Sequence, residues 1–167
     1  MNVLDLFSGI GGFSVGLEAT GKFKTIGFCE QDKFCQKVLR KHWSNVPIYE
    51  DIKKLDARKI KADVVVGGFP CQSISIAGKQ KGKDDDRNLW PDVAKLIRGL
   101  GVPIVFLENG PGILRYYWDN IRPELREMGY EVTEGLFSAA ETGAPHKRQR
   151  IFILAYSRGI SREKEVS

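Results

Sequence analysis

Val64 to Gly78 read V-V-V-G-G-F-P-C-Q-S-I-S-I-A-G. The three valines at the start predict a buried β-strand, because β-branched residues pack well in a sheet. Two glycines and a proline follow and end the strand. Cys71 therefore lies in a loop just beyond the carboxyl end of a strand, where open α/β sheets bind their ligands. We interpret Cys71 as a candidate nucleophile; the alternative is a small buried hydrophobic residue, the usual role of a free cysteine.

Length and composition limit the class of protein. The 167 residues suffice for one domain with a sizeable core, and 42% hydrophobic and 28% charged residues are ordinary for a globular chain. The net charge of +5 suits a polyanionic partner without requiring one. Three cysteines and two histidines predict neither a disulfide framework nor a zinc site, and they fit a reducing, cytoplasmic setting. We expect no signal peptide and no membrane span.

Hydrophobic patterns and turn residues predict alternating strands and helices. Strands are predicted at residues 2–7, 24–29, 46–49, 63–67, 103–107, 130–138 and 150–156. Helices are predicted after Gly12, after a cap at Asp32, around residues 91–100, and through 113–128 with an interruption near Pro123. Residues 53–61 are expected to form a surface helix or turn.

Two further stretches carry specific expectations. Residues 73–88 lack apolar periodicity and contain the charged run K-Q-K-G-K-D-D-D-R, which predicts a long exposed loop. This loop is either functional, closing over a phosphate backbone, or a solvated connection. In the helix after Asp32, the side chains of Cys35, Val38 and Leu39 are expected to form the apolar face, which would place Cys35 in the core.

A glycine-rich turn lies between the first predicted strand and the first predicted helix. Residues 5–13 read D-L-F-S-G-I-G-G-F. Glycines at such a turn let a ligand approach the backbone. The pattern is not G-x-G-x-x-G, so a pyrophosphate ligand is not implied, and an ordinary turn between a strand and a helix is the alternative.

Acidic residues follow three of the predicted strands. Glu30 lies near the offset at which an acid binds a ribose, although it could instead be an acid at the start of a helix. Asp51 is placed to accept from an adenine amino group, and its alternative is a solvated turn. Glu108 is placed to donate or share a proton, with a helix-start carboxylate as the alternative. The glycine turn and Glu30 together favour an adenosine-containing ligand.

A basic cluster, A-P-H-K-R-Q-R, lies between the last two predicted strands at residues 144–150. Arg148 and Arg150 alternate along the chain, so both are expected on one face at the start of a strand. Such a pair suits a phosphate or a base carbonyl. The alternative is a solvated basic turn.

Taken together and in this order, these motifs resemble those of the DNA (cytosine-5)-methyltransferases. The resemblance rests on D-L-F-S-G-I-G-G, Glu30, Asp51, P-C-Q at 70–72, E-N at 108–109 and R-Q-R at 148–150, and it extends from Asn2 to about Tyr156. It implies an α/β, Rossmann-like, S-adenosylmethionine-dependent methyltransferase fold. The sheet would be mostly parallel with one antiparallel strand near an edge, and helices would cover both faces. Residues 1–156 would form the catalytic domain and residues 157–167 a polar tail.

The resemblance also implies a cofactor and a set of roles. The cofactor would be S-adenosylmethionine, with S-adenosylhomocysteine as product and no metal. The cofactor-binding residues would be Phe7, Ser8, Gly9, Gly11, Gly12, Glu30, Asp51, Ile52, Pro70 and Leu89. Cys71 would add to C6 of a flipped cytosine in DNA, Glu108 would contact N3 and Arg150 would contact O2, with Arg148 nearby. The addition is needed because C5 of cytosine is by itself too weak a nucleophile to take a methyl group.

This sequence departs from the family pattern in three residues and in length. Gly110 replaces a usual valine, His146 a usual glutamine, and Glu50 a usual glycine, none of which removes a catalytic group.

The family continues into a target-recognition domain and two further motifs. Three hypotheses follow: the catalytic half of a split enzyme completed by a second polypeptide, a minimal enzyme, or an inactive remnant that binds cofactor or a partner. The intact Cys71, Glu108 and Arg150 argue against the remnant. Exposed apolar surface would also favour a homodimer.

Overall fold

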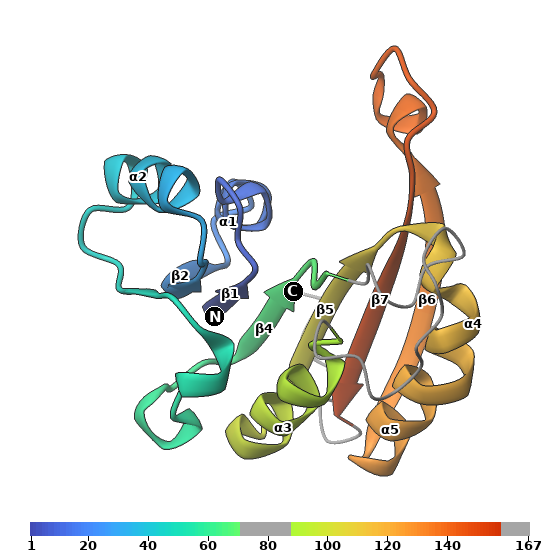
Figure 1. The fold of residues 1–167 in the computed structure, drawn as a ribbon. Coiled ribbons are helices and arrows are strands. Elements are labelled where there is room, and N and C mark those ends of the chain that lie inside the picture. The colour runs from blue at the N-terminus through green and yellow to red at the C-terminus, as the bar shows by residue number, and fades with distance from the viewer. Residues whose placement is uncertain (71–87, 158–167) are drawn as a thin grey trace, which may run out of the picture.

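The computed structural model describes residues 1–70 and 88–157. Within them, seven strands form one sheet in the order β3-β2-β1-β4-β5-β7-β6 (Figure 1). The strands are β1 (Asn2–Leu6), β2 (Lys24–Cys29), β3 (Ile48–Tyr49), β4 (Val64–Gly67), β5 (Ile104–Asn109), β6 (Tyr130–Ser138) and β7 (Gln149–Ser157). Cys71, most of the loop predicted at 73–88, and the tail beyond residue 157 lie outside the described residues.

The sheet is parallel except for one strand. β3, β2, β1, β4 and β5 pair in parallel, whereas β7 pairs antiparallel with both β5 and β6. The prediction of one antiparallel strand near an edge is therefore confirmed. Because β7 is reversed, its first residues lie at the edge of the sheet where β5 ends; Asn109 at the end of β5 pairs with Ile151 of β7.

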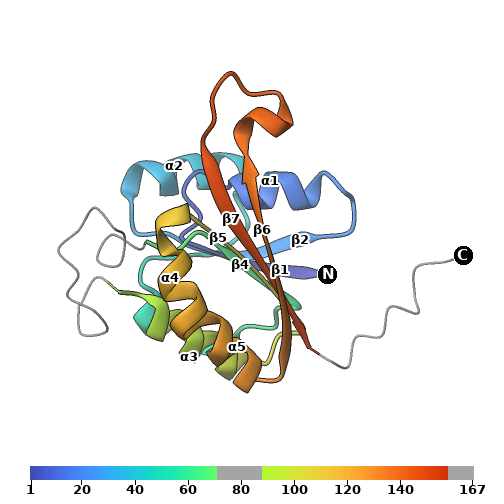
Figure 2. The same ribbon diagram turned by 90° about the vertical axis from the view of Figure 1, so that its right-hand side faces the viewer.

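Helices cover both faces of the sheet, as predicted. The helices are α1 (Gly12–Glu18), α2 (Lys33–His42), α3 (Trp90–Leu100), α4 (Leu114–Tyr116) and α5 (Arg122–Glu127). Figure 2 shows α1 and α2 on one side of the sheet and α3, α4 and α5 on the other. No helix of the described residues is long and apolar enough to cross a membrane.

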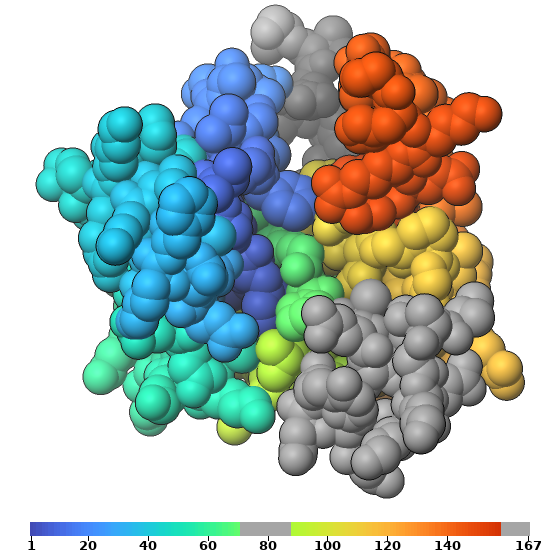
Figure 3. All heavy atoms as spheres, turned by 45° about the horizontal axis from the view of Figure 1, so that its top comes forward, coloured from blue at the N-terminus to red at the C-terminus, as the bar shows by residue number. Residues whose placement is uncertain are grey.

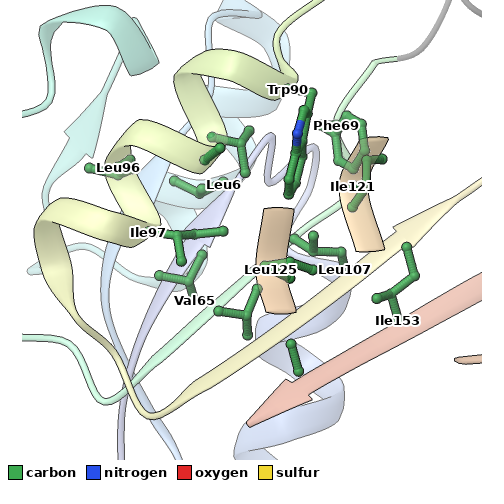
Figure 4. Close-up of a cluster of buried hydrophobic side chains, with 14 of the residues drawn as sticks. Leu6, Val65, Phe69, Trp90, Leu96, Ile97, Leu107, Ile121, Leu125 and Ile153 are labelled. Carbon is green, nitrogen blue, oxygen red and sulfur yellow. The ribbon is translucent and has the colours of Figure 1, made fainter. Parts of the chain in front are cut away.

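Strand alternation divides the core between these two faces. Val64 and Val66 pack with the α1 side chains Phe13 and Leu17, while Val65 points the other way. On that second face a larger cluster joins β4 and β5 to α3 and α5 (Figure 4). All three valines are at most 2% exposed, which confirms the buried strand predicted from the run at 64–66.

The apolar face predicted for α2 needs correction. Asp32 does cap α2, accepting from the Cys35 N–H at 2.8 Å. On this helix, however, Leu39 is buried, Cys35 is only half-buried, and Gln36 is the other buried side chain. Gln36 is buried because its amide donates to the main-chain carbonyl of Glu30 at 2.7 Å, so a polar contact replaces part of the expected apolar face.

The helical segment before Gly129 is continuous through Pro123. A wide π turn at Tyr117–Ile121 leads directly into α5, where Pro123 occupies the first turn. A proline inside a helix normally clashes with the preceding turn, and the wider π turn makes room for its ring, so the predicted interruption takes the form of a change in helix type. The segment predicted at 53–61 as a surface helix or turn contains two short 3₁₀ turns, Ile52–Lys54 and Ala57–Lys59, which agrees with the second alternative.

Candidate active site

A cavity of about 450 Å³ lies at the carboxyl ends of β1, β2 and β4. Figure 3 looks toward this edge of the sheet, where the surface is hollowed between the N-terminal segments and the β6–β7 end. Six of the residues predicted to bind a cofactor line the cavity: Phe7, Glu30, Asp51, Ile52, Pro70 and Leu89. They come from five separate segments, which the fold brings to one site.

The carboxylate of Glu30 is fixed by two backbone N–H groups. Gly9 donates to Oε2 at 2.8 Å and Asp32 donates to Oε1 at 2.7 Å. Glu30 therefore links the glycine turn to the start of α2. Each oxygen of a carboxylate has a further lone pair, so Glu30 can still accept from two hydroxyls of a ligand.

Asp51 is held in a similar way at the next strand end. Its Oδ1 accepts from the Lys53 N–H at 2.9 Å, where Asp51 caps a short 3₁₀ turn. The carboxylate keeps further acceptor capacity toward the cavity that it lines. Both acids are thus held by backbone N–H groups at the carboxyl ends of the strands.

The glycine turn contacts the cavity through Glu30, which accepts from the Gly9 N–H and lines the cavity. Ser8, Gly9, Gly11 and Gly12 are not among the residues that line it, so direct contact of these four with a cofactor stays a prediction. Gly11 has φ +92°, and a Cβ built there would lie 2.7 Å from the Trp43 ring. The absence of a side chain at Gly11 is therefore required by packing against α2 as well as by backbone conformation.

Beneath this turn lies a buried acid that the sequence analysis did not identify. Asp5 is fully buried in β1 and accepts from the Ser14 hydroxyl at 2.7 Å. Among the described residues, its other oxygen, Oδ1, has no hydrogen-bond partner. Burial raises the pKa of Asp5 to about 7. The signal that was available is an aspartate within an otherwise apolar strand.

The predicted base-binding pair is assembled from β5 and β7. Arg150 Nε lies 2.6 Å from Glu108 Oε1, and both side chains are about a quarter exposed (29% and 23%). The two residues meet because the reversed β7 brings its first residues beside the end of β5. Charge-assisted contacts of this kind are stronger than neutral hydrogen bonds.

Gly68 makes room for this pair. A Cβ built at Gly68 would lie 2.7 Å from Glu108 Oε2, so any larger residue would displace the carboxylate. Gly68 also lines the cavity, which places the Glu108 carboxylate close to it. Neither property was predicted, because a second glycine after a strand indicates only a turn.

For the remaining predicted site residues the structure gives only part of the geometry. Pro70 lines the cavity, and Cys71, the predicted nucleophile, lies outside the described residues. Arg148 is exposed in the β6–β7 connection, where its carbonyl accepts from the Ala139 N–H at 3.0 Å. A role for its side chain stays a prediction. The described residues contain no group of three or more His, Cys, Asp or Glu side chains able to hold a metal.

Sequence reasoning also missed part of the cavity wall. Cys29, Gln31, Glu50 and Lys53 line it in addition to the predicted residues. Burial raises the pKa of the Cys29 thiol to about 12, so this cysteine is held as a neutral wall residue. Glu50 forms an ion pair with Lys33 of α2. Each lies next to a predicted residue, so proximity in the chain was the available signal.

Comparisons with known proteins identify the family. The fold is that of an α/β methyltransferase, as similar solved structures bear out. A family model described as C-5 cytosine-specific DNA methylase matches residues 1–166, and the chain belongs to this family.

Curated relatives support this assignment. The chain is 37% identical over 162 residues to the Type II methyltransferase M1.ScrFI of Lactococcus lactis subsp. cremoris, covering 93% of this chain and 41% of the relative. It is 31% identical to the Type II methyltransferase M.HhaI of Haemophilus parahaemolyticus, covering 96% of this chain and 50% of the relative. The chain thus spans half or less of the length of these relatives.

Solved structures show the same fold at lower identity. A mutant of DNMT2 from Spodoptera frugiperda superposes with a TM-score of 0.81 at 21% identity, covering 99% of this chain and 53% of that chain. Dnmt2 methyltransferase from S. pombe gives a TM-score of 0.75 at 21% identity, covering 94% of this chain and 51% of that chain. The fold class predicted from the sequence is confirmed.

Proposed function

We propose that this chain is a catalytic region that transfers a methyl group from S-adenosylmethionine to C5 of cytosine in DNA. The observation that carries the proposal is the Glu108–Arg150 pair, 2.6 Å apart, beside Gly68 at the edge of the cavity. A carboxyl and a guanidinium group at this position match the N3 and O2 edge of a cytosine. Family membership supplies the reaction class.

The cavity fits the proposed cofactor in size and chemistry. Its volume of about 450 Å³ lies in the range of small-molecule sites. Glu30 would accept from the ribose hydroxyls and Asp51 from the adenine amino group, while Phe7, Ile52, Pro70 and Leu89 would provide apolar contacts. S-adenosylmethionine, when bound, would supply a methyl group activated by a sulfonium centre.

Cys71, Glu108 and Arg150 would each activate the cytosine in a different way. The thiolate of Cys71 would form a bond to C6 of the flipped base, which moves the C5–C6 electron pair toward C5. Glu108 would hold a proton at N3 and Arg150 would donate to O2, so that charge on the ring is neutralised. After C5 is methylated, loss of its proton returns an electron pair to the ring and releases the Cys71 thiolate.

The sequence also predicted partners other than DNA. The second polypeptide of a split enzyme and the homodimer find no support in the comparisons, and both stay predictions, as does the cytoplasmic location. The alternative function is a module that binds cofactor without catalysis. No specific contact in the described residues favours that alternative over methyl transfer.

The test is transfer of label from S-adenosylmethionine with a tritiated methyl group to mixed-sequence DNA. We expect tritium on C5 of cytosine with the wild-type chain, and none with Cys71→Ala. Cys35→Ala is a matched control, because Cys35 lies on α2, away from the cavity wall, and should leave the label intact. Cofactor binding without any transfer by the wild type would reject catalysis and favour the binding module.

A further inference from the structure

The connection between β3 and β4 contains a short tandem repeat. Residues 51–60 read D-I-K-K-L-D-A-R-K-I, which is two units of five with the pattern acidic, apolar, basic, basic, apolar. In each unit the aspartate side chain accepts from the N–H two residues further on. Asp51 accepts from Lys53 at 2.9 Å, and Asp56 accepts from Arg58 at 3.1 Å. Each aspartate thereby caps one of the two 3₁₀ turns, so the repeat in sequence is also a repeat in structure.

The apolar positions of both units attach this tandem repeat to the rest of the protein. Ile52 is 6% exposed, and three further side chains are half-buried against the same core: Leu55, Ala57 and Ile60. The second unit also packs closely on α3, because a Cβ built at Gly99 would lie 3.0 Å from the Ala57 Cβ (Figure 1). The segment is therefore packed against the domain, and its basic side chains extend from fixed backbone positions.

The basic positions of the repeat face solvent. Residues 53–61 contain one acid, Asp56, and five exposed basic side chains, which are Lys53, Lys54, Arg58, Lys59 and Lys61. These nine residues thus have a net charge of +4, compared with +5 for the whole chain. Asp56 forms an ion pair with Arg58 at 2.9 Å, whereas no ion pair among the described residues includes Lys54 or Lys59. The fourth position of each unit therefore offers a cation to an external partner.

Helix α2 is also basic, but some of its cations are engaged within the protein. Lys33 forms an ion pair with Glu50, and Arg40 donates to another side chain of the same helix at 3.1 Å. Lys37 and Lys41 are exposed. Because α2 and α3 lie on opposite sides of the sheet, the lysines of α2 provide a comparison surface with the same kind of charge at a different place (Figure 2).

We propose that the tandem repeat binds the phosphate backbone of the DNA that flanks the target cytosine. This inference rests on the proposed function and adds a contact that does not depend on base sequence. Lys53 lines the cofactor cavity, and the second unit lies beside a further cavity of about 550 Å³ against α3, so the repeat leads away from the edge of the site. Two pairs of cations at a regular spacing suit a polymer of regularly spaced negative charges, and such contacts position a protein on DNA without reading its bases.

The first experiment measures how salt weakens binding to a fluorescent DNA duplex of mixed sequence, by anisotropy and without cofactor. Each phosphate contact adds about 0.9 to the slope of log K against log salt. For the double variant Lys54→Gln with Lys59→Gln we expect the slope to become shallower by about 1.8 and the Kd at about 0.1 M salt to rise about tenfold or more.

The control for this experiment is the double variant Lys37→Gln with Lys41→Gln on α2. It has the same net charge as the first double variant, and its slope should stay within about 0.5 of the wild type. Equal changes in the two double variants would mean that net charge alone matters and would overturn the inference. An unchanged slope in the variant of the repeat, or a wild type that does not bind the duplex, would overturn it as well.

The second experiment predicts a change in the opposite direction. In Asp56→Asn the side-chain oxygen can still cap the turn, but Arg58 loses its ion pair and becomes available to a phosphate. We expect the slope to become steeper by about 0.9. Glu50→Gln releases Lys33 on α2 in the same way and should leave the slope unchanged, so equal steepening in both variants would reject the repeat.

Both experiments measure binding without turnover. If the wild type transfers no methyl group but the two sets of variants differ as expected, the proposed function fails and the contact with DNA stands. If methyl transfer occurs and the variants of the repeat bind DNA like the wild type, the proposed function stands and the contact is rejected.

Discussion

The cofactor half and the base half of this site hold their acids in different ways. In the cofactor half, at the ends of β1, β2 and β3, Glu30 and Asp51 accept from backbone N–H groups. In the base half, at the end of β5 and the start of β7, Glu108 is held by the side chain of Arg150. One half is therefore fixed by the course of the backbone, and the other by a pair whose two members are both proposed to bind the same base.

This difference predicts which contacts in each half would persist and which would break when a ligand binds. Under the proposed function, Glu30 would keep its backbone bonds while it accepts from a ribose, because its oxygens have further lone pairs. Glu108 and Arg150 would have to exchange their contact with each other for contacts with the cytosine. We therefore expect the cofactor half to be preorganised and the base half to rearrange, so that substitutions should separate binding of cofactor from chemistry on the base.

The largest effect expected from this comparison is that of Glu108→Gln. The amide can still accept from Arg150 but has no proton to give to N3 of the base. We expect kcat for methyl transfer to fall about 10³-fold with the Kd for S-adenosylmethionine unchanged, as single-turnover assays and calorimetry would measure. Glu131→Gln is a control, since Glu131 is exposed on β6 and accepts from the Tyr156 hydroxyl at the far end of the sheet. A parallel loss of cofactor affinity in Glu108→Gln would show that the halves are not separate.

The next effect concerns Asp5, which supports the cofactor half from below. In the folded protein the pKa of Asp5 is raised by burial to about 7, from an ordinary value of 3.8. The stability that the protonated group contributes is thus fully present below that ordinary value and is lost as the pH rises through 7. Relative to Asp5→Asn, we expect the free energy of unfolding of the wild type to fall by about 3 kcal/mol between about pH 5 and about pH 8.

Denaturant unfolding at several pH values measures this difference. The Asp5→Asn variant is the reference, because an asparagine keeps the shape and does not titrate. A constant difference between the two proteins across the whole range would contradict the expectation. It would also mean that the cofactor half is supported independently of pH.

The smallest of the three effects is expected for Glu30→Gln. A glutamine can accept at one end only, so it cannot serve both the Gly9 and the Asp32 N–H groups and a ribose. We expect the Kd for S-adenosylmethionine to rise about tenfold, with kcat at saturating cofactor within about twofold of the wild type. Glu127→Gln, at the exposed end of α5, removes a charge far from the cavity and serves as control. A large fall in kcat with unchanged affinity would reverse the assignment of the two halves.

Sequence reasoning predicted the strand ends well because their signals are local. The runs at Lys24–Cys29 and Tyr130–Ser138 match β2 and β6 at both ends. The acids Glu30 and Asp51 follow strands, and parallel strands bring their ends to one edge. Position in the chain was therefore enough to place these residues in one cavity.

What sequence reasoning missed depends on contacts between distant segments. The need for glycine at position 68 comes from Glu108, forty residues later in the chain, and the need for glycine at position 11 comes partly from Trp43. The burial of Gln36 depends on a carbonyl at the end of β2. No local periodicity encodes such contacts, because they arise only when two elements pack together.

The reversal of β7 has a consequence for how this edge of the sheet can be extended. In a wholly parallel sheet, only the connections from strand to helix reach the ligand-binding edge. Here a turn between two strands reaches it as well, and Figure 1 shows the β6–β7 end rising above the sheet on that side. Gly143 is exposed within this connection and has φ +90°. A peptide grafted at Gly143 would be presented over the substrate side of the molecule, while the paired strands behind it keep their register.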